Sequence, residues 1–364
     1  MMRILILANN DVGLYKFRKE LLEELHKNHY EVFASLPAGE FEEQIKALGC
    51  TYIETDINRR GTNPFEDLKL YGKYKKMMRE IKPDLVLTYT IKPNVYGGMA
   101  CQKYKIPYIV NVTGLGSALE NGGALQQLTK QMYKAGLKKA NMVFLQNEEN
   151  LNFMKKNGVL SGPYDLIPGS GVNTSQYAYC DYPKEEMIHF VFVGRMMKEK
   201  GFELYLDCAK QIHDKYPNTL FHICGIKEEN YYERVKQLNE EGVCYYHGLV
   251  DDMKEIYSQV HCVIHPTYYP EGMSNVLLEA SACGRPVITT NRAGCREIVD
   301  DGINGFIVEQ KDLNDLVEKV EKFLSLSNKE KEQLGKNGRK KVEQQFDRKI
   351  VVRKYMDEIR KLEK

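Results

Sequence analysis

Short runs rich in β-branched residues and leucine alternate with helix-spaced apolar residues from the start of the chain. In the first half the helical spacing marks residues 17–27 and 68–81. The runs that predict strands are 3–8, 31–36, 85–89, 108–112 and 142–146. Such alternation is typical of parallel sheets with helices on both faces.

A second series of the same kind follows the stretch 163–183, which is marked by proline and glycine. Its predicted strands are 189–193, 220–224, 260–265, 287–290 and 306–308, and a charged helical tail runs over 312–364. We therefore expect an α/β fold of two doubly wound Rossmann-like domains facing across a cleft. The expected bounds are 1–172 for the first domain, 173–187 for a linker and 188–345 for the second.

The stretch YYPEGMSNVLLEASACGRP at 268–286 carries the first candidate chemistry. Glu271 and Gly272 fall in the turn after a predicted strand, and Ser274 is placed to cap the helix that follows. The start of a helix attracts phosphate, because its free N–H groups and the helix dipole both favour an anion. This turn is therefore a candidate anion site.

Glu279 lies about two turns into that helix among apolar neighbours. A carboxylate in such surroundings is costly unless it is hydrogen-bonded, and the hydroxyls of a ligand could supply the bonds. Eight residues separate it from Glu271, about 12 Å along a helix, which is too far for the two acids to share one reacting bond. They could grip opposite ends of one long ligand. The alternative is a structural Glu279 paired with an arginine or a backbone amide.

The stretch VFVGRMMKEKGFELYL places Gly194, Arg195 and Lys200 directly after another predicted strand. Glycine admits close approach of the backbone, and the two cations could neutralise a pyrophosphate. Taken alone, the same pattern also fits an ordinary surface loop.

The remaining glycine-rich turns are weaker signals. The turn that contains Gly13, after the first strand, lacks the G-x-G-x-x-G spacing, which disfavours an NAD enzyme. The chain has no D-x-D pair and no His or Cys cluster with ligand spacing, so we expect no metal and no cofactor. Basic side chains must then hold the pyrophosphate.

Length and composition agree with an ordinary two-domain enzyme. The 364 residues are 43% apolar and 28% charged, and the nine cysteines form no C-x-x-C pair, which favours a reducing compartment. The apolar run at the N-terminus is too short for a signal peptide, and no later run is long enough for a membrane span, so we expect a soluble chain.

The net charge of +2 is unevenly distributed. Residues 59–139 hold fifteen Lys or Arg against five Asp or Glu, a local excess of +10. Such a basic face could meet nucleic acid, an anionic membrane or a phosphorylated substrate, or it could be a solvated helix surface.

Taken together, the segment from Glu271 to Glu279, the Arg195 and Lys200 loop, and GCREIVDDGINGFIV at 294–308 resemble the retaining glycosyltransferases of family 4. IKPDLVLTYTIKPNVYG, VTGLGS and RRGTNP are similar to the bacterial subgroup that extends lipid-linked sugars for capsule, O-antigen or glycoprotein glycans. Within this subgroup, the chain is similar in particular to enzymes that add N-acetylgalactosamine to an undecaprenyl-diphosphate sugar. The resemblance implies the GT-B fold, with a last helix, about 346–364, that packs back on the first domain.

The resemblance also implies roles for individual residues. Arg195 and Lys200 would hold the diphosphate, Glu271 the hydroxyls of the donor sugar and Glu279 the ribose. The further residues expected at the donor are Gly13, Gly194, Gly225, Ile226, Leu249, Gly272, Met273, Ser274 and Asn275. Glu271, Arg195 and Lys200 form the expected catalytic set.

In one respect the chain departs from the family pattern. Many members present a histidine from the first domain to the reacting carbon, whereas this chain has no His between His29 and His189. Lys92, Asn94 or the loop at Thr113 and Gly114 are the candidates for that contact. Together with Arg59 and Arg60, these residues make up the expected acceptor site.

The leading hypothesis is a metal-independent, retaining transfer of a hexose or N-acetylhexosamine from a UDP-sugar to a polyprenyl-diphosphate-linked saccharide. The enzyme would be cytoplasmic and peripheral on the inner face of the cell membrane, held to anionic lipid by its basic first domain, with no nucleic-acid partner. The alternatives are a UDP-sugar 2-epimerase of similar fold and a non-catalytic UDP-sugar-binding subunit.

Overall fold

The protein folds as two compact units, seen here in a computed structural model that describes residues 1–59, 61, 63–116, 122–184 and 186–363. The first unit contains Met1–Gly171, Glu271–Met273 and Arg348–Lys364. The second contains Val172–Pro270 and Ser274–Asp347. Each unit is described by itself.

The first unit is built on a parallel sheet of seven strands in the order β3-β2-β1-β4-β5-β6-β7. The strands are β1 (Arg3–Leu7), β2 (Glu31–Leu36), β3 (Cys50–Glu54), β4 (Leu85–Tyr89), β5 (Tyr108–Val112), β6 (Met142–Leu145) and β7 (Tyr164–Leu166). The central strands are buried on both faces, as their largely apolar runs require.

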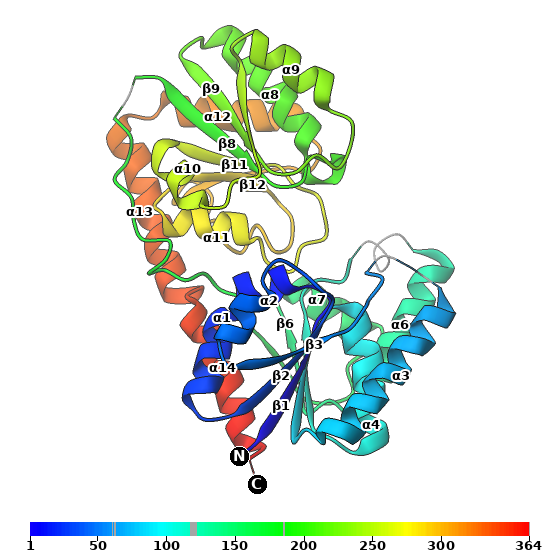
Figure 1. Cartoon of the computed structure of the whole chain (residues 1–364). Helices are drawn as coiled ribbons and strands as arrows, with labels where there is room; N and C mark the ends of the chain where they lie inside the picture. The colour runs from blue at the N-terminus through cyan, green and yellow to red at the C-terminus, as the bar shows by residue number, and fades with distance from the viewer. Residues whose placement is uncertain (60, 62, 117–121, 185, 364) are drawn as a thin grey trace. The chain divides into compact units, whose positions relative to one another are not determined.

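Helices cover both faces of this sheet (Figure 1). One face carries α1 (Asp11–Lys27), α2 (Glu42–Ala47) and α14 (Arg348–Lys361). The other face carries α3 (Pro64–Ile81), the π-helical turn η1 (Pro93–Gly97), α4 (Gly98–Tyr104), α6 (Gly123–Leu137) and α7 (Glu148–Lys156). The loops that follow the strands all lie at one carboxyl edge, where ligands bind in open α/β sheets.

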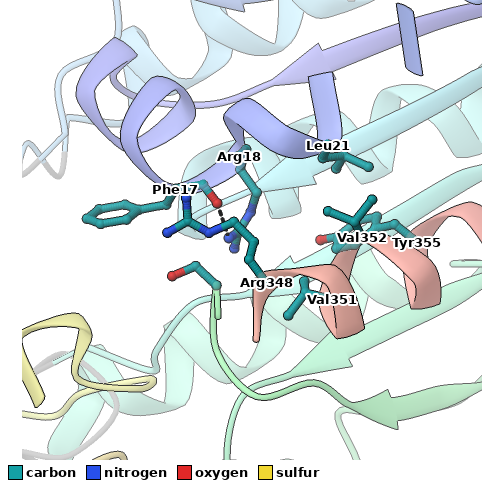
Figure 2. A pocket seen from close by; sticks show the side chains of 8 residues that line it. Phe17, Arg18, Leu21, Arg348, Val351, Val352 and Tyr355 are labelled. Carbon is teal, nitrogen blue, oxygen red and sulfur yellow. Dashed lines mark hydrogen bonds between the residues drawn. The ribbon is translucent and has the colours of Figure 1, made fainter. Parts of the chain in front are cut away.

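The last helix is anchored by charge as well as by packing. Arg348 donates to both carboxylate oxygens of Glu20, at 3.0 and 2.8 Å, and to the carbonyl of Gly171. Tyr355 accepts from the buried Asn111 amide at 2.7 Å. A cavity of about 10 Å³, enough for one water molecule, remains between α1 and α14 and is lined by side chains of both helices (Figure 2).

The second unit has a parallel sheet of six strands in the order β10-β9-β8-β11-β12-β13. The strands are β8 (Ile188–Val193), β9 (Thr219–Cys224), β10 (Cys244–Gly248), β11 (Cys262–His265), β12 (Val287–Thr290) and β13 (Gly305–Val308). In each sheet the strand order runs outward in one direction from the first strand and then continues on its other side, from β1 to β4 in the first sheet and from β8 to β11 in the second. This is the doubly wound order. The predicted fold class is therefore confirmed.

The helices of the second unit pack around an aromatic core. Phe190, Phe192, Phe202 and Tyr205 lie in it, between the sheet and the helices α8, α9 and α12. The helical elements are η2 (Lys198–Lys200), α8 (Phe202–Lys215), α9 (Tyr232–Glu240), α10 (Met253–Gln259), α11 (Asn275–Ala282), α12 (Leu313–Ser325) and α13 (Asn328–Gln345). α11 packs on β11 and β12, and α13 packs against α11.

The sequence pattern missed three strands, β3, β7 and β10. β3 and β7 are the two edges of the first sheet, and β10 is an edge of the second. An edge strand is covered on fewer sides, so its residues can be polar or half exposed; Tyr245 on β10, for example, is 52% exposed. The apolar run that identifies a buried strand is therefore absent at these positions.

A row of histidines crosses the second sheet. His189 Nδ1 lies 2.8 Å from His222 Nε2, and His222 Nδ1 lies 2.8 Å from His247 Nε2. Burial, and then the neighbouring His189 and His247, lower the pKa of His222 to about 3. Burial, and then Lys200, likewise lower the pKa of His265 to about 3. Both imidazoles are therefore neutral in the folded protein at pH 7.

We expect these histidines to make folding sensitive to acid. Their folded pKa values lie below the unfolded value of 6.5, so the unfolded chain binds more protons between pH 3 and 6.5. Stability is complete above pH 6.5 and falls as the pH drops, by about 1–2 kcal/mol for each histidine by pH 5. Urea unfolding at pH 7 and pH 5 measures this loss. His222→Gln should show a smaller loss than the unchanged protein, and equal losses would contradict the assignment.

Candidate functional site

The carboxyl edge of the second sheet is lined by backbone. The first three strands in its order end next to Gly248, Gly225 and Gly194, and the Gly225 N–H donates to the Gly248 carbonyl at 2.8 Å. Gly225 has a φ of 140°, and a Cβ there would stand 1.9 Å from the Gly194 carbonyl oxygen. Only glycine fits, so a ligand can approach the backbone closely here.

Two cations converge on one aromatic ring beside this edge. The guanidinium of Arg195 lies 5.2 Å from the ring centre of Tyr269, and the Lys200 ammonium lies 5.0 Å from the same centre. Arg195 also pairs with Glu228 at 2.7 Å. Arg195 and Lys200, which follow β8 in the sequence, thus come together at Tyr269 in the loop after β11. The two positive charges suit an anion.

Hydrogen bonds hold this arrangement in place. The Glu199 carbonyl, in the turn η2, accepts from the Tyr268 amide at 2.9 Å and from the Thr267 hydroxyl at 3.3 Å. The Tyr269 amide donates to the Thr267 hydroxyl at 3.2 Å. The turn that carries Lys200 and the loop that carries Tyr269 are therefore one connected structure.

The start of α11 differs in detail from the sequence expectation. Ser274 occupies the cap position and is buried, but its side chain makes no capping hydrogen bond; its amide donates to the Gly294 carbonyl at 2.8 Å. The N–H groups of the first turn are thus not satisfied by the cap side chain, which suits a helix start that receives an anion.

Glu279 is half buried rather than enclosed. It shares the less buried face of α11 with Asn275 and Val276, whereas Leu277 and Leu278 are fully covered. Burial, and then the nearby charge of Glu279, raise the pKa of Tyr257 well above its usual value. The carboxylate therefore needs no large compensation for burial, and it stands on the same helix face as Asn275.

The segment Glu271–Met273 packs within the first unit. A Cβ at Gly272 would stand 2.1 Å from the Thr113 carbonyl oxygen and 2.4 Å from Gln146 Oε1. Asn147 Nδ2 donates to the Gly272 carbonyl at 2.6 Å and to the Glu271 carbonyl at 3.3 Å. The structure thus brings the predicted sugar-binding segment against the predicted acceptor loop.

Sequence reasoning missed Gln146 and Asn147. Both follow β6 at the carboxyl edge of the sheet, and Asn147 also caps α7. A polar pair directly after a buried parallel strand is the signal that could have identified them.

The other predicted residues of the first unit lie in different surroundings. Gly13 is in the first turn of α1, where its amide donates to Asn10 Oδ1. Arg59 is exposed, and Arg60 lies outside the described residues. Lys92 is 12% exposed and pairs with Asp67 at 2.7 Å. Asn94 is fully buried and donates to the Asn111 carbonyl at 2.9 Å, so its amide faces the interior.

Thr90 is a candidate that the sequence did not reveal. It follows β4 at the carboxyl edge with a φ of 72°, a left-handed conformation that β-branched residues rarely adopt. Within the described residues, its buried hydroxyl has no hydrogen-bond partner. The left-handed backbone and the unpaired hydroxyl together make Thr90 a candidate contact for a ligand.

Ile226 and Leu249 stand on the loops after β9 and β10 and are 50% and 73% exposed. Exposed apolar side chains beside the glycine-lined strand ends suit a flat ring such as a nucleobase.

No group of three or more His, Cys, Asp or Glu side chains among the described residues is arranged to hold a metal ion. None of the helices in the described part of the chain is long and apolar enough to cross a bilayer.

Comparison with known proteins gives two family matches. Residues 182–341 match the family described as glycosyl transferases group 1, and residues 3–147 match the family described as glycosyl transferase 4-like. The two matches together cover most of both sheets.

Individual relatives agree with these matches. The chain is 27% identical to the N,N'-diacetylbacillosaminyl-diphospho-undecaprenol alpha-1,3-N-acetylgalactosaminyltransferase of Campylobacter jejuni, over 98% of this chain and 97% of that protein. It is 25% identical to an Escherichia coli UDP-Gal:alpha-D-GlcNAc-diphosphoundecaprenol alpha-1,3-galactosyltransferase, over 71% of this chain and 70% of that protein.

Solved structures share the fold. Anabaena HepE in complex with UDP and glucose superposes with a TM-score of 0.80 at 16% identity, over 99% of this chain and 100% of that one. Two parallel-sheet units, a family match on each and relatives along the full length lead to one conclusion: the chain belongs to the GT-B glycosyltransferases, with a group 1 glycosyl transferase domain in its second half.

Proposed function

We propose that the enzyme transfers a hexose or N-acetylhexosamine from a UDP-sugar to a polyprenyl-diphosphate-linked saccharide, with retention of anomeric configuration and without a metal. The observation that carries the proposal is the convergence of Arg195 and Lys200 on Tyr269 beside the glycine-lined strand ends. The names of the Campylobacter and Escherichia relatives, which act on undecaprenyl-diphosphate-linked sugars, support the acceptor.

The charges suit the chemistry of the donor. Departure of UDP breaks the bond between C1 of the sugar and a β-phosphate oxygen, and negative charge grows on that phosphate. Arg195 and Lys200 stabilise this charge more in the transition state than in the ground state, which is the condition for catalysis. Two fixed cations therefore supply the neutralisation for which other transferases use a metal.

Retention follows if the acceptor attacks from the face that UDP leaves. The new bond forms between C1 and the acceptor oxygen, and the acceptor proton passes to the departing β-phosphate. This route needs no nucleophile from the enzyme. Glu271 would hold hydroxyls of the donor sugar, and Thr90, Thr113 and Gly114 would contact the acceptor from the first unit.

We propose that the enzyme works at the inner face of the cell membrane, with the basic stretch 59–139 facing anionic lipid. The excess of +10 in that stretch supports this. Each Lys or Arg near such a surface contributes roughly 1 kcal/mol, less as salt rises. The alternatives, a 2-epimerase or a non-catalytic subunit, are not favoured by the family matches.

The test is transfer from UDP-N-acetylgalactosamine and three other UDP-hexoses to undecaprenyl-diphosphate-linked N-acetylhexosamine in detergent. We expect release of UDP that depends on the acceptor, a product with the anomeric configuration of the donor by NMR, and an unchanged rate in EDTA. An inverted product would exclude the retaining route, and loss of activity in EDTA would exclude metal independence. UDP-sugar epimerised without acceptor would support the rival.

The role of Glu279 leads to a further prediction. If its carboxylate binds the ribose, Glu279→Gln should weaken UDP-sugar binding by roughly 10- to 100-fold, since hydrogen bonds to charged groups are worth about 1.5–3 kcal/mol. Titration calorimetry with UDP-sugar and with its 2′-deoxy and 3′-deoxy analogues forms a double-mutant cycle. The substitution should cost little with the analogue that lacks the bonded hydroxyl. Equal losses with all three ligands would assign Glu279 a structural role.

A further inference from the structure

Four large apolar side chains are exposed to solvent on the first two turns of two helices of the first unit. Phe65 and Leu68 on α3 are 83% and 65% exposed, and Leu125 and Leu128 on α6 are 49% and 58% exposed. Scattered exposed apolar residues are common, but two pairs at i, i+3 spacing near the starts of two helices that both pack against η1 and α4 need an explanation. We call these four residues the apolar tip.

Both halves of the tip lie at the carboxyl edge of the sheet. α3 follows the loop after β3 and α6 follows the loop after β5, so each helix begins where the parallel strands end. The turn η1 packs against both helices, and all three cover the same face of the sheet (Figure 1). The tip is therefore beside the edge that carries Thr90 and Thr113.

Basic residues follow the tip along both helices. α6 has no acidic residue, and Lys134 is exposed nine residues after Leu125, on the opposite side of the helix. α3 carries five basic residues, of which Lys69, Lys76 and Arg79 are exposed, against three acidic ones. The apolar ends of both helices thus give way to positive charge.

Two of the three acids of α3 are already engaged. Asp67 is only 13% exposed and pairs with Lys92 at 2.7 Å, and Glu66 accepts from Asn58 at 3.0 Å. The charge of Asp67 is therefore offset by a lysine outside α3, whereas Glu66 keeps its charge and Glu80 lies 3.8 Å from Lys76.

Apolar residues at the helix starts, followed by cations further along each helix, match the acyl chains and headgroups of a bilayer surface better than they match a protein partner. Along the helix axis Lys69 follows Phe65 by about 6 Å and Lys134 follows Leu125 by about 14 Å. Interfacial helices bury their apolar residues about 5–10 Å into the boundary between headgroups and acyl chains, with Lys and Arg at the headgroups. A docking surface for protein would not need its cations set back at this depth.

We propose that the apolar tip inserts into a bilayer that contains anionic lipid, while Lys69 and Lys134 contact the headgroups. The carboxyl edge of the first unit then faces the membrane. Since a polyprenyl diphosphate emerges from the bilayer at headgroup level, its diphosphate is presented to the edge that holds Thr90, Thr113 and Gly114. This inference rests on the proposed function and specifies how the membrane-bound acceptor reaches the enzyme.

The absence of tryptophan from the chain allows a direct test of insertion. Full-length Phe65→Trp and Leu128→Trp each carry a single tryptophan at the tip. With vesicles of phosphatidylcholine and phosphatidylglycerol that contain brominated acyl chains, we expect a blue shift and quenching of the emission. Ile303→Trp, at a residue of the second unit that is 56% exposed, is the matched control and should show neither change. Quenching of all three alike, or of none, would overturn the proposal.

A second experiment measures affinity and separates the tip from the active site. In vesicle sedimentation the Phe65→Ser/Leu128→Ser protein should bind about a hundredfold more weakly, because each buried apolar side chain contributes about tenfold or more. Lys69→Gln/Lys134→Gln should weaken binding at low salt and have less effect at high salt. Binding that ignores both substitutions, or that needs no anionic lipid, would contradict the inference.

Transfer to a short-chain, water-soluble acceptor distinguishes this failure from failure of the proposed function. The Phe65→Ser/Leu128→Ser protein should use that acceptor at the normal rate and lose rate only on vesicle-bound acceptor. If light scattering instead shows that the unchanged chain is a dimer which this substitution dissociates, a second copy of the chain covers the tip and the bilayer assignment is wrong.

Discussion

We expect Lys200→Ala to lower kcat/KM for sugar transfer by roughly 10²- to 10³-fold, the cost of removing one preorganised stabiliser of developing charge. The ammonium lies 5.0 Å from the centre of the Tyr269 ring, and the turn that carries it is hydrogen-bonded to the loop of Tyr268. Because charge on the β-phosphate is greatest in the transition state, most of the loss should fall on kcat, with a smaller rise in KM.

A lysine two residues away provides the control. Lys198 belongs to the same turn, is 65% exposed and lies 3.9 Å from Glu203. Lys198→Ala removes the same charge from the same element and should change kcat/KM less than threefold, as rim charges usually do. If both variants lose activity equally, the effect is one of net charge, and the diphosphate does not rest on Lys200.

The largest expected effect on stability comes from Arg285. Its side chain is fully buried and lies 5.4 Å from the centre of the Tyr182 ring. Its guanidinium donates to the carbonyls of Asp181 at 2.8 Å, Val260 at 3.2 Å and Cys180. These bonds tie the segment before β8 to the segments before β11 and β12, so one side chain joins three parts of the second unit.

Arg285→Met should destabilise the second unit by about 3–5 kcal/mol. Methionine fills much of the volume but leaves the carbonyls unpaired, and each unsatisfied buried polar group costs about 1–3 kcal/mol. For a unit of this size that is roughly 6–20 °C in thermal midpoint by calorimetry. Arg353→Met, at an exposed position of α14, should shift the midpoint by less than about 2 °C. A similarly small shift for Arg285→Met would show that water replaces the lost bonds.

Much of the fold was predictable because buried parallel strands carry their own signal. Strands with both faces covered, such as β4 and β11, are largely apolar runs, and these two were located within one or two residues. The edge strands β3, β7 and β10 were not found, because a strand that packs on fewer sides is free to be polar.

The candidate site was predictable only where its residues follow strands along the chain. Gly194, Arg195 and Ser274 stand in turns after strands, and glycine, cation and helix-cap signals identify such turns from local sequence. The partners of these residues could not be predicted. Nothing near Arg195 in the sequence indicates that Arg195 and Lys200 both contact the Tyr269 ring, because that contact depends on how neighbouring strands align.

The acceptor-side candidates show the same limit. Lys92 and Asn94 lie in the motif TYTIKPN, yet the structure pairs the first with Asp67 and buries the second against Asn111. Thr90 in the same motif has the strained backbone and the unpaired hydroxyl. A backbone conformation of this kind is imposed by packing around the residue, so it cannot be predicted from the residue type.

By itself, then, the sequence determined the doubly wound class, the positions of most strands and the turns that carry the candidate phosphate-binding residues, because periodicity and turn residues act within a few positions. Only the tertiary structure decided which side chains meet, which are buried and where apolar residues stay in solvent. The physical reason is that these properties arise from contacts between residues far apart in the chain. Lys92 with Asp67, Gly272 with Thr113 and Tyr269 with Arg195 become neighbours only when the sheets have formed.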